Sequence, residues 1–313
     1  MKKIAYLFPG QGSQYVGMGK ELTNNHPNAK ALVELADQTL GFSLSDIMFN
    51  GPEETLKETQ NTQPALLTTS YALYLTAKDQ LPKADYMLGH SLGEYTALVA
   101  AGSLSFTDAV YLVHKRGEFM NQAVPNGLGA MAAVLGSTRE VVEEACHQVV
   151  EVVEPANFNS PGQIVISGSA EGVKKATDLL KTKGVKKIIP LAVSGPFHSS
   201  LMKPAADQLK ELLDDISFAN SQSPVVQNVD ALAKTDGNVM KDLLVNQVSS
   251  SVLWEDSIRY LVKEGVDTFI EIGPGKLLTG LVKKIKRDVS VYNIFDEISM
   301  QETINKLMQI EGK

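Results

Sequence analysis

The chain has 313 residues, of which 43% are hydrophobic and 21% are charged, as is usual for a globular protein with a substantial core. Its formal net charge of −7 argues against a general nucleic-acid binder, and its single cysteine, Cys146, excludes a disulfide framework and a cysteine-based metal site. The apolar run at residues 4–8 is too short for a signal peptide, and no stretch approaches the length of a membrane span. We therefore expect a cytoplasmic protein that does not enter a membrane.

A predicted strand at residues 4–8 leads into a glycine-rich loop that contains Gln11. This loop does not match a phosphate-binding loop, because Gly19-Lys20 lacks a glycine five positions earlier and is followed by Glu21. Its backbone N–H groups can instead serve a neighbouring site. Helices are predicted next at residues 28–40 and 63–75, the second introduced by Gln63-Pro64.

The segment at residues 89–93, Gly-His-Ser-Leu-Gly, lies between a short apolar run and a predicted helix at residues 94–101. A strand, a Gly-x-Ser-x-Gly turn and a helix in this order are typical of a nucleophile elbow, which presents the serine hydroxyl at the end of a sheet. The helix that follows would favour an oxyanion at its N-terminus. The pattern also occurs by chance, and a purely structural glycine-rich turn is the alternative.

Arg116 lies in a predicted helix over residues 108–120. At 100° per residue it falls in the middle of an apolar face formed by Ala109, Leu112, Val113 and Met120, whereas His114 and Lys115 point elsewhere. An arginine in this position needs a partner or a wet cavity. Snorkelling at the rim of the helix and an internal salt bridge are the structural alternatives.

Residues 126–195 form a predicted β-α-β-β-α-β unit, which is the ferredoxin-like pattern. The expected strands are residues 130–135, 151–155, 163–167 and 186–193, and the expected helices are residues 138–150 and 170–183. On the first of these helices, His147 is expected at the surface and Cys146 as a partly buried filler.

The last part of the chain begins with a glycine- and proline-rich loop around His198. It continues with a predicted helix at residues 201–213, predicted strands at 223–229 and 268–272, and a final predicted helix. That helix has Leu277, Leu278, Leu281, Val282 and Ile285 on its inward face, and its other face carries the basic residues Lys283, Lys284, Lys286 and Arg287. Such a charged face is usually solvated, but in an acidic chain it can also bind an acidic partner.

A serine nucleophile needs a base, and His198 is the strongest of five histidine candidates. His90 adjoins Ser91 but its side chain should diverge from it, His26 precedes the elbow, and His114 and His147 are predicted to face solvent. His198 follows the serine in chain order, as in the α/β-hydrolase arrangement. No aspartate or glutamate stands out as a third member.

Eight separated stretches together resemble the malonyl-CoA:acyl carrier protein transacylase family, in the order found in that family. They are FPGQGSQ (8–14), TQPALL (62–67), GHSLGEYTALVAAG (89–102), HKRGEFM (114–120), ANFNSPGQIVISG (156–168), GPFHSSLMKPAA (195–206), QNVDA (227–231) and EIGPGKLLTGL (271–281). The resemblance implies an α/β fold, with an α/β-hydrolase-like core over residues 1–125 and 196–313 and an inserted ferredoxin-like subdomain over residues 126–195.

The resemblance also implies the chemistry. Ser91 would be acylated by malonyl-CoA, the phosphopantetheine thiol of acyl carrier protein would then take the malonyl group, and His198 would be the base and acid in both steps. The backbone N–H groups of Leu92 and Gln11 would form the oxyanion hole, so that Gln11 also contacts substrate. No metal or cofactor is implied.

Three further roles are carried over from the family. Arg116 would bind the malonyl carboxylate, Phe197 resembles the malonyl-type variant of the loop before the histidine, and the main-chain carbonyl of Gln247 would orient His198. The chain has four arginines and twenty-five lysines, so an arginine at position 116 is suggestive. The family often has a proline shortly after this glutamine, where this chain has Ser251, and this departure weakens the assignment of Gln247.

Three alternative functions remain open. A polyketide-synthase acyltransferase would share every catalytic residue. A serine hydrolase such as a thioesterase would have no use for Arg116. A catalytically inactive scaffold would not need the site residues. We expect a monomer that binds acidic acyl carrier protein at Lys283, Lys284, Lys286 and Arg287. The competing surface is formed by the lysines of the inserted subdomain, Lys174, Lys175, Lys181, Lys183, Lys186 and Lys187.

Overall fold

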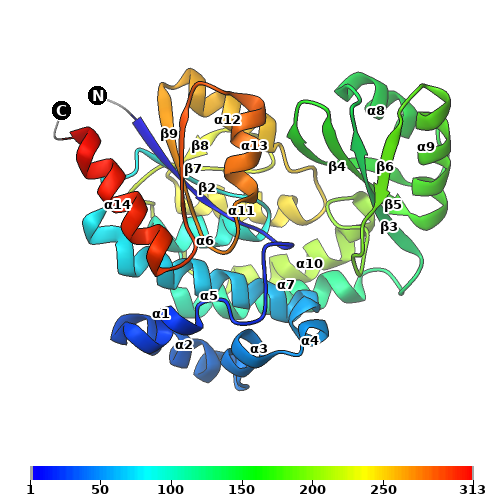
Figure 1. Cartoon of the computed structure of the whole chain (residues 1–313). Coiled ribbons are helices and arrows are strands. Elements are labelled where there is room, and N and C mark those ends of the chain that lie inside the picture. Colours follow the sequence, from blue (N-terminus) through cyan, green and yellow to red (C-terminus); the bar gives the residue numbers. More distant parts are fainter. Residues whose placement is uncertain (1–2, 312–313) are drawn as a thin grey trace.

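The computed structural model describes residues 3–311 and contains a larger, mostly parallel sheet and a smaller antiparallel sheet (Figure 1). The predicted α/β fold is confirmed. Residues 1–2 and 312–313, the ends of the predicted larger part, lie outside the described residues. No helix within residues 3–311 has the length and apolar composition that crossing a bilayer requires.

The larger sheet has the strand order β10-β9-β1-β2-β7-β8, and only β8 runs antiparallel to its neighbour. Its strands are β1 (Lys3–Phe8), β2 (Tyr86–Gly89), β7 (Val225–Val226), β8 (Ala233–Lys234), β9 (Val266–Ile272) and β10 (Ser290–Ile294). The central strands are apolar on both faces because helices cover both sides of a parallel sheet. The carboxyl ends of β1 and β2 therefore meet at one edge, which is where the site lies.

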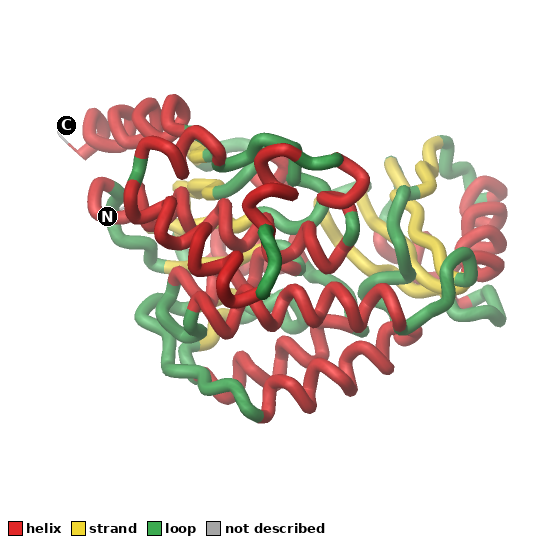
Figure 2. Tube along the Cα trace, turned by 90° about the horizontal axis from the view of Figure 1, so that it is seen from below, coloured by secondary structure: helices red, strands yellow, loops and turns green. Residues whose placement is uncertain are grey.

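Alternate residues of β1 pack into two different cores. Ala5 and Leu7 face α12 (Trp254–Lys263) and α13 (Leu277–Ile285), whereas Tyr6 and Phe8 face the helices on the opposite side. The helices on that side and at the margins are α1 (Lys20–Asn25), α2 (Pro27–Leu40), α3 (Leu44–Asn50), α4 (Glu53–Lys57), α5 (Thr59–Ala77), α6 (Leu92–Ala100), α7 (Phe106–Gln122), α10 (Lys203–Asp214), α11 (Gly237–Val248) and α14 (Glu297–Glu311). Viewed from below, helices cover this side of the larger sheet, and strands of the smaller sheet are visible at the right (Figure 2).

The smaller sheet has the order β4-β5-β3-β6 with every pair antiparallel, which is the ferredoxin-like arrangement that the sequence predicts. Its elements are β3 (Gly129–Leu135), α8 (Arg139–His147), β4 (Val153–Ser160), β5 (Gln163–Ser169), α9 (Ala170–Thr182) and β6 (Lys187–Pro190). This sheet lies inside the predicted limits of 126–195; those limits themselves stay a prediction. Cys146 is more buried than expected, at 4% exposure, and His147 is exposed.

The predicted start of the second helix at Gln63-Pro64 is wrong, because α5 begins at Thr59 and Pro64 lies inside it. Proline has no N–H, so it cannot bond the carbonyl of Gln60 one turn earlier. The ring of His114 replaces this donor, since its Nδ1 lies 2.8 Å from the Gln60 oxygen. His114 is therefore partly buried and does not face solvent as expected.

Two other predictions in the last part of the chain need correction. The strand expected at residues 223–229 shrinks to β7, because Asn228 leaves the ladder to bond the elbow after β2. Leu277 was assigned to the inward face of α13, but it is 50% exposed. It is the first residue of the helix and lies about 100° away from Leu278, at the edge of the apolar stripe.

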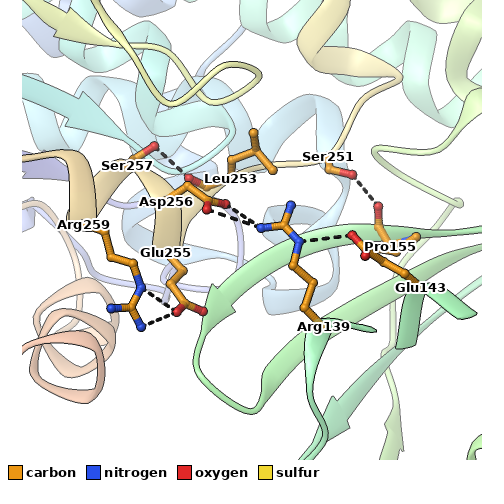
Figure 3. A network of polar contacts seen from close by, with 9 residues as sticks. All are labelled: Arg139, Glu143, Pro155, Ser251, Leu253, Glu255, Asp256, Ser257 and Arg259. Atoms are coloured by element: carbon orange, nitrogen blue, oxygen red, sulfur yellow. Dashed lines mark hydrogen bonds and ion pairs between the residues drawn. The ribbon is translucent and has the colours of Figure 1, made fainter. Parts of the chain in front are cut away.

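Polar contacts connect the elements around the smaller sheet with those around the larger sheet (Figure 3). Arg139 at the start of α8 bonds Glu143 on its own helix and Asp256 on α12 at 3.0 Å, and its guanidinium lies 3.8 Å from the ring centre of Phe158. Ser251 Oγ donates a hydrogen bond to the main-chain oxygen of Pro155. The segment after α11 is thereby attached to β4, so the serine that departs from the family pattern has a structural role.

Candidate active site

The elbow between β2 and α6 holds Ser91 in a strained conformation with φ 51° and ψ −108°. The turn is possible only with glycine on both sides. A Cβ at Gly89 would lie 1.8 Å from the carbonyl carbon of Gly93, and one at Gly93 would lie 2.0 Å from the oxygen of Phe8. The close approach of α6 to β1 and β2 therefore directs the serine hydroxyl toward the edge of the sheet.

His198 reaches this hydroxyl from a segment more than a hundred residues further along the chain. Its Nε2 lies 2.8 Å from Ser91 Oγ, and its Nδ1 lies 2.9 Å from the main-chain oxygen of Gln247. A carbonyl oxygen can only accept, so Nδ1 carries the proton and Nε2 is free to accept from the serine. The structure thus brings together the serine, the histidine and the Gln247 carbonyl that the sequence analysis assigned to one site.

His198 is neutral at physiological pH. Burial first, and the charge of Arg116 second, lower the pKa of the imidazole to about 3. The hydrogen bond to the Gln247 carbonyl acts in the opposite direction but is weaker than these two causes. A neutral imidazole is the form that can accept the serine proton.

Arg116 projects from α7 into the site and is 1% exposed. Its Nη1 donates to Gln63 Oε1 at 2.8 Å, and its Nη2 donates to Gln247 Oε1 at 2.9 Å and to Ser91 Oγ at 3.2 Å. The guanidinium also lies 5.4 Å from the ring centre of Tyr95. Arg116 does not snorkel to solvent, and within residues 3–311 it forms no ion pair, so both structural alternatives fail.

The two predicted oxyanion donors lie beside the serine. Leu92 is the first residue of α6, and Gln11 lies in the loop after β1; both line the same cavity as Ser91. In the part of the chain that the structure describes, neither backbone N–H donates a hydrogen bond to another protein group. The side chain of Gln11 is held by Thr59 Oγ1 at 3.3 Å. Free N–H groups at a helix N-terminus and an adjacent loop are suited to an oxyanion.

The cavity over Ser91 has a volume of about 140 Å³ and lies between the two sheets. The part with the larger sheet contributes the polar end, with Gln63 and Arg116, and the segment from Leu191 to Phe197 contributes apolar walls. Phe197 itself is buried and lines the cavity. A larger cavity of about 320 Å³ lies between β10 and α14, and the serine among its described lining residues, Ser299, donates its hydroxyl to Asp296 and not to a histidine.

Two residues of the site were missed by the sequence analysis. Asn228 accepts from the Ser91 N–H at 2.7 Å and donates to the Gly89 oxygen at 2.7 Å. Glu94, which is 1% exposed, accepts from the Asn228 N–H at 2.8 Å and from Gln247 Nε2 at 3.0 Å. The available signal was a single carboxylate in an otherwise uncharged helix, because such a group needs buried partners.

The site defines a class of protein. It contains a nucleophilic serine, a neutral histidine held by a carbonyl, free oxyanion donors and a buried arginine. They are the parts of an enzyme that forms an acyl-serine and that offers a cation to the acyl group. The α/β-hydrolase-like core is the scaffold on which such elbows occur.

The comparisons with known proteins agree with this class. The model of the acyl transferase domain family matches residues 5–307. Malonyl CoA-acyl carrier protein transacylase of Bacillus subtilis (strain 168) is 53% identical over 312 residues, covering 99% of this chain and 98% of the relative. The protein of the same name from Staphylococcus aureus (strain MSSA476) is 48% identical over 297 residues, covering 94% and 96%. The chain belongs to the acyl transferase family and, within it, to the malonyl CoA-acyl carrier protein transacylases.

Solved structures give the same answer for the fold. An acyl carrier protein S-malonyltransferase from Vibrio cholerae superposes with a TM-score of 0.94 at 43% identity, covering 96% of this chain and all of that one. A malonyl-transacylase solved in complex with a type II PKS acyl-carrier protein superposes with a TM-score of 0.94 at 41% identity, covering 97% and 100%.

Proposed function

We propose that this enzyme transfers the malonyl group of malonyl-CoA to the phosphopantetheine thiol of acyl carrier protein, through a malonyl-Ser91 intermediate, in fatty acid biosynthesis. The observation that carries the proposal is the place of Arg116. Its guanidinium lies 3.2 Å from Ser91 Oγ in a largely apolar cavity, where an acyl group on the serine must lie. A buried cation there favours an acyl group with its own carboxylate.

In the first half-reaction, Ser91 Oγ attacks the thioester carbonyl carbon of malonyl-CoA while His198 Nε2 takes the hydroxyl proton. The carbonyl oxygen becomes an oxyanion, which the N–H groups of Gln11 and Leu92 stabilise. When the tetrahedral intermediate collapses, the carbon–sulfur bond breaks and the thiol of coenzyme A leaves with the proton from His198. The serine is then a malonyl ester.

The second half-reaction repeats these steps with a different nucleophile. His198 takes the proton of the phosphopantetheine thiol, and the sulfur attacks the ester carbonyl of malonyl-Ser91. Collapse breaks the bond to Ser91 Oγ, and His198 returns the proton to the serine. The same base, oxyanion donors and acyl pocket serve both halves. The reaction is ping-pong because coenzyme A leaves the malonyl-Ser91 enzyme before the carrier thiol attacks.

The malonyl carboxylate also affects the base. Arg116 is the second cause of the low pKa of His198, and a carboxylate paired with the guanidinium would offset its charge. The pKa of His198 would then rise, which makes the imidazole a stronger base in the complex with malonyl-CoA than in the free enzyme. An acetyl group carries no charge and would leave the base weak.

A serine hydrolase and a polyketide-synthase acyltransferase are the competing functions. Hydrolysis has no use for a cation beside the serine, which argues against the first. The second would use the same residues, and one structural relative of this chain is a malonyl-transacylase in complex with a type II PKS acyl-carrier protein. The choice of the fatty-acid pathway, the cytoplasmic location and the monomeric state stay predictions.

The proposed function is tested by intact-mass analysis after mixing the protein with malonyl-CoA or with acetyl-CoA. We expect one malonyl adduct per chain within seconds, a much slower acetyl adduct, and loss of the malonyl adduct when holo acyl carrier protein is added, together with a mass gain on the carrier. Apo carrier protein, which lacks the thiol, is the control and should leave the adduct in place. Rapid release of free malonate with no mass gain on the carrier would instead identify a hydrolase.

We also propose that acyl carrier protein docks on the basic face of α13 and the residues after it. Lys284, Lys286 and Arg287 are exposed there, and Lys284 Nζ bonds Gln163 Oε1 at 3.1 Å, so this face continues onto the β4–β5 turn. Lys283 stabilises the end of the helix, because its Nζ donates to the main-chain oxygens of Arg287 and Val289. These bonds close the end of α13, although Lys283 is itself exposed.

Three of the six competing lysines of the smaller sheet pair with acidic neighbours, whereas Lys174, Lys186 and Lys187 form no ion pair within residues 3–311. Lys175 pairs with Glu151 and Glu171, and Lys181 pairs with Asp178 at 3.6 Å. Lys183 pairs with Glu144 at 3.1 Å. On the basic face, Lys286 pairs with Asp288, but Lys284 and Arg287 form no ion pair within the described residues. Both surfaces therefore offer unpaired cations, and charge reversal on each of them decides which one the carrier protein uses.

Reversing the charge of Lys284 and Arg287 together, as Lys284→Glu with Arg287→Glu, should raise the apparent KM for acyl carrier protein about 10-fold at low salt. The difference from wild type should shrink as salt is added, and the rate of Ser91 acylation by malonyl-CoA should not change. Lys174→Glu with Lys181→Glu, which makes the same change of charge on α9 of the smaller sheet, is the matched control. An equal effect of this control, or an equal loss in both half-reactions, would contradict docking at α13.

A further inference from the structure

A chain of three side chains crosses the interior directly behind the nucleophile. Arg116 Nη2 donates to Gln247 Oε1 at 2.9 Å, and the Nε2 of the same amide donates to Glu94 Oε2 at 3.0 Å. Arg116 and Glu94 are each 1% exposed, and Gln247 is fully buried. A buried cation and a buried carboxyl are thus joined through one neutral amide.

The two ends of this chain determine which way the Gln247 amide points. The oxygen must face the guanidinium, which only donates, and the nitrogen must face Glu94 Oε2, which accepts because it also receives the Asn228 N–H. Turning the amide over would place two donors together at Arg116 and two acceptors together at Glu94. The nitrogen also donates to the main-chain oxygen of Ser91 at 3.0 Å, so the same orientation supports the elbow.

We propose that Glu94 is a positioning residue that fixes the Gln247 amide, and through it the direction of the Arg116 guanidinium, so that the enzyme favours a dicarboxylic acyl group over a neutral one. Glu94 does not touch the acyl cavity, and its effect is therefore indirect. The inference rests on the proposed function, because it deepens the role of Arg116 in that reaction.

The position of Glu94 suits this task. It lies on the first turn of α6, three residues after the nucleophile, and its Oε2 also accepts from the N–H of Asn228. One carboxyl oxygen therefore holds both the amide of Gln247 and the backbone of the segment that binds the elbow. Burial raises the pKa of Glu94 to about 7, but Oε2 can accept hydrogen bonds in either protonation state.

The test is the ratio of Ser91 acylation by malonyl-CoA to acylation by acetyl-CoA, measured as kcat/KM with the full chain. In Glu94→Ala the Gln247 amide keeps the Ser91 oxygen and Asn228 Oδ1 as acceptors but loses the carboxyl group that holds it, and we expect the malonyl rate to fall about 10–100-fold, as for the loss of a buried hydrogen-bond partner. The acetyl rate should change by less than about 3-fold, since it does not use Arg116. Labelling of Ser91 by a small neutral sulfonyl fluoride should stay near the wild-type rate.

Two further variants separate positioning from general damage. Glu94→Gln keeps an acceptor oxygen for both donors, so it should restore the ratio to within about 3-fold of wild type. Gln247→Ala removes the amide but keeps the main-chain oxygen that bonds His198, and in that background Glu94→Ala should cause no further loss of the ratio. The coupling between the two sites is the readout that a merely structural role would not produce.

The inference is overturned if Glu94→Ala slows malonyl, acetyl and sulfonyl fluoride reactions equally, if Glu94→Gln is as defective as Glu94→Ala, or if the two losses simply add. These results leave the proposed function standing. Failure of the wild-type protein to form a malonyl adduct is a separate outcome, and it would overturn the proposed function.

Discussion

Replacing Ser91 with alanine should abolish the malonyl adduct and lower transfer to acyl carrier protein by at least about 10⁴-fold, as when the nucleophile of a serine enzyme is removed. No other hydroxyl or thiol side chain lines the cavity of the described structure, so no second nucleophile can take the acyl group there. The measurement is intact mass after incubation with malonyl-CoA, with malonyl transfer followed on the carrier protein.

The fold should survive this change. Alanine has the same Cβ as serine, so the strained backbone at φ 51° is neither relieved nor worsened. The lost contacts are the hydroxyl bonds to His198 and Arg116. Ser160→Ala is the control for loss of a serine hydroxyl, because Ser160 is fully buried and its hydroxyl has no hydrogen-bond partner within the described residues. A malonyl adduct that persists in Ser91→Ala would place the nucleophile elsewhere.

The elements that support the site were predictable because their signals are local. The elbow at residues 89–93 combines a short apolar strand, two glycines and a helix, and each of these is readable within about fifteen residues. The ferredoxin-like unit is equally local, since its strands and helices alternate in order. The half-exposed strand β10 has too weak an apolar pattern to predict, because it is an edge strand paired on one side.

The helix α5 shows where local rules fail. A proline normally marks the first turn of a helix, and so Gln63-Pro64 predicts a start. The chain instead places Pro64 inside the helix and supplies the missing donor from His114 on α7. His114 lies fifty-four residues from Gln60, whose carbonyl it bonds, and no pattern near residue 64 contains it.

The active site was predictable in its reacting groups and not in the network behind them. Ser91 was a candidate from its own local pattern, and helical phasing only marked Arg116 as unusual. The roles of Arg116 and of the Gln247 carbonyl came from the family resemblance. The bonds that Glu94 forms with Asn228 and Gln247 span 134 and 153 residues, so nothing near Glu94 in the sequence indicates them. The one indication in the sequence was the carboxylate of Glu94 among the apolar residues of its helix.

Arg116→Ala should lower the rate of Ser91 acylation by malonyl-CoA roughly 10²–10³-fold, because a buried malonyl carboxylate would lose its cationic partner. The rate of acylation by acetyl-CoA should not fall. It should rise if proton abstraction by His198 limits the rate, because the pKa of His198 is higher without Arg116. The preference for malonyl over acetyl is therefore expected to disappear. Single-turnover acylation with each thioester, followed by intact mass, measures both rates.

The same variant should shift the pH dependence of acylation by acetyl-CoA, a substrate without an ionising acyl group. The wild-type rate should stay constant as pH falls until it approaches the His198 pKa of about 3. Removing Arg116 removes the second cause that lowers this pKa, while burial remains. The pKa then rises, more imidazole is protonated at mildly acidic pH, and the acid limb of kcat/KM moves to higher pH.

Arg116→Lys is the control that separates charge from geometry. Lysine keeps a positive charge near His198, so the acid limb should stay close to that of wild type. An ammonium group lacks the planar fork that bonds Gln63 and Gln247 while still facing a carboxylate, so malonyl preference should fall to a value between wild type and Arg116→Ala. If Arg116→Lys moved the acid limb as far as Arg116→Ala does, the charge of Arg116 would not be what depresses the base. If it kept full malonyl preference, a cation alone would select the acyl group, and the hydrogen bonds that hold the guanidinium would be dispensable for selection.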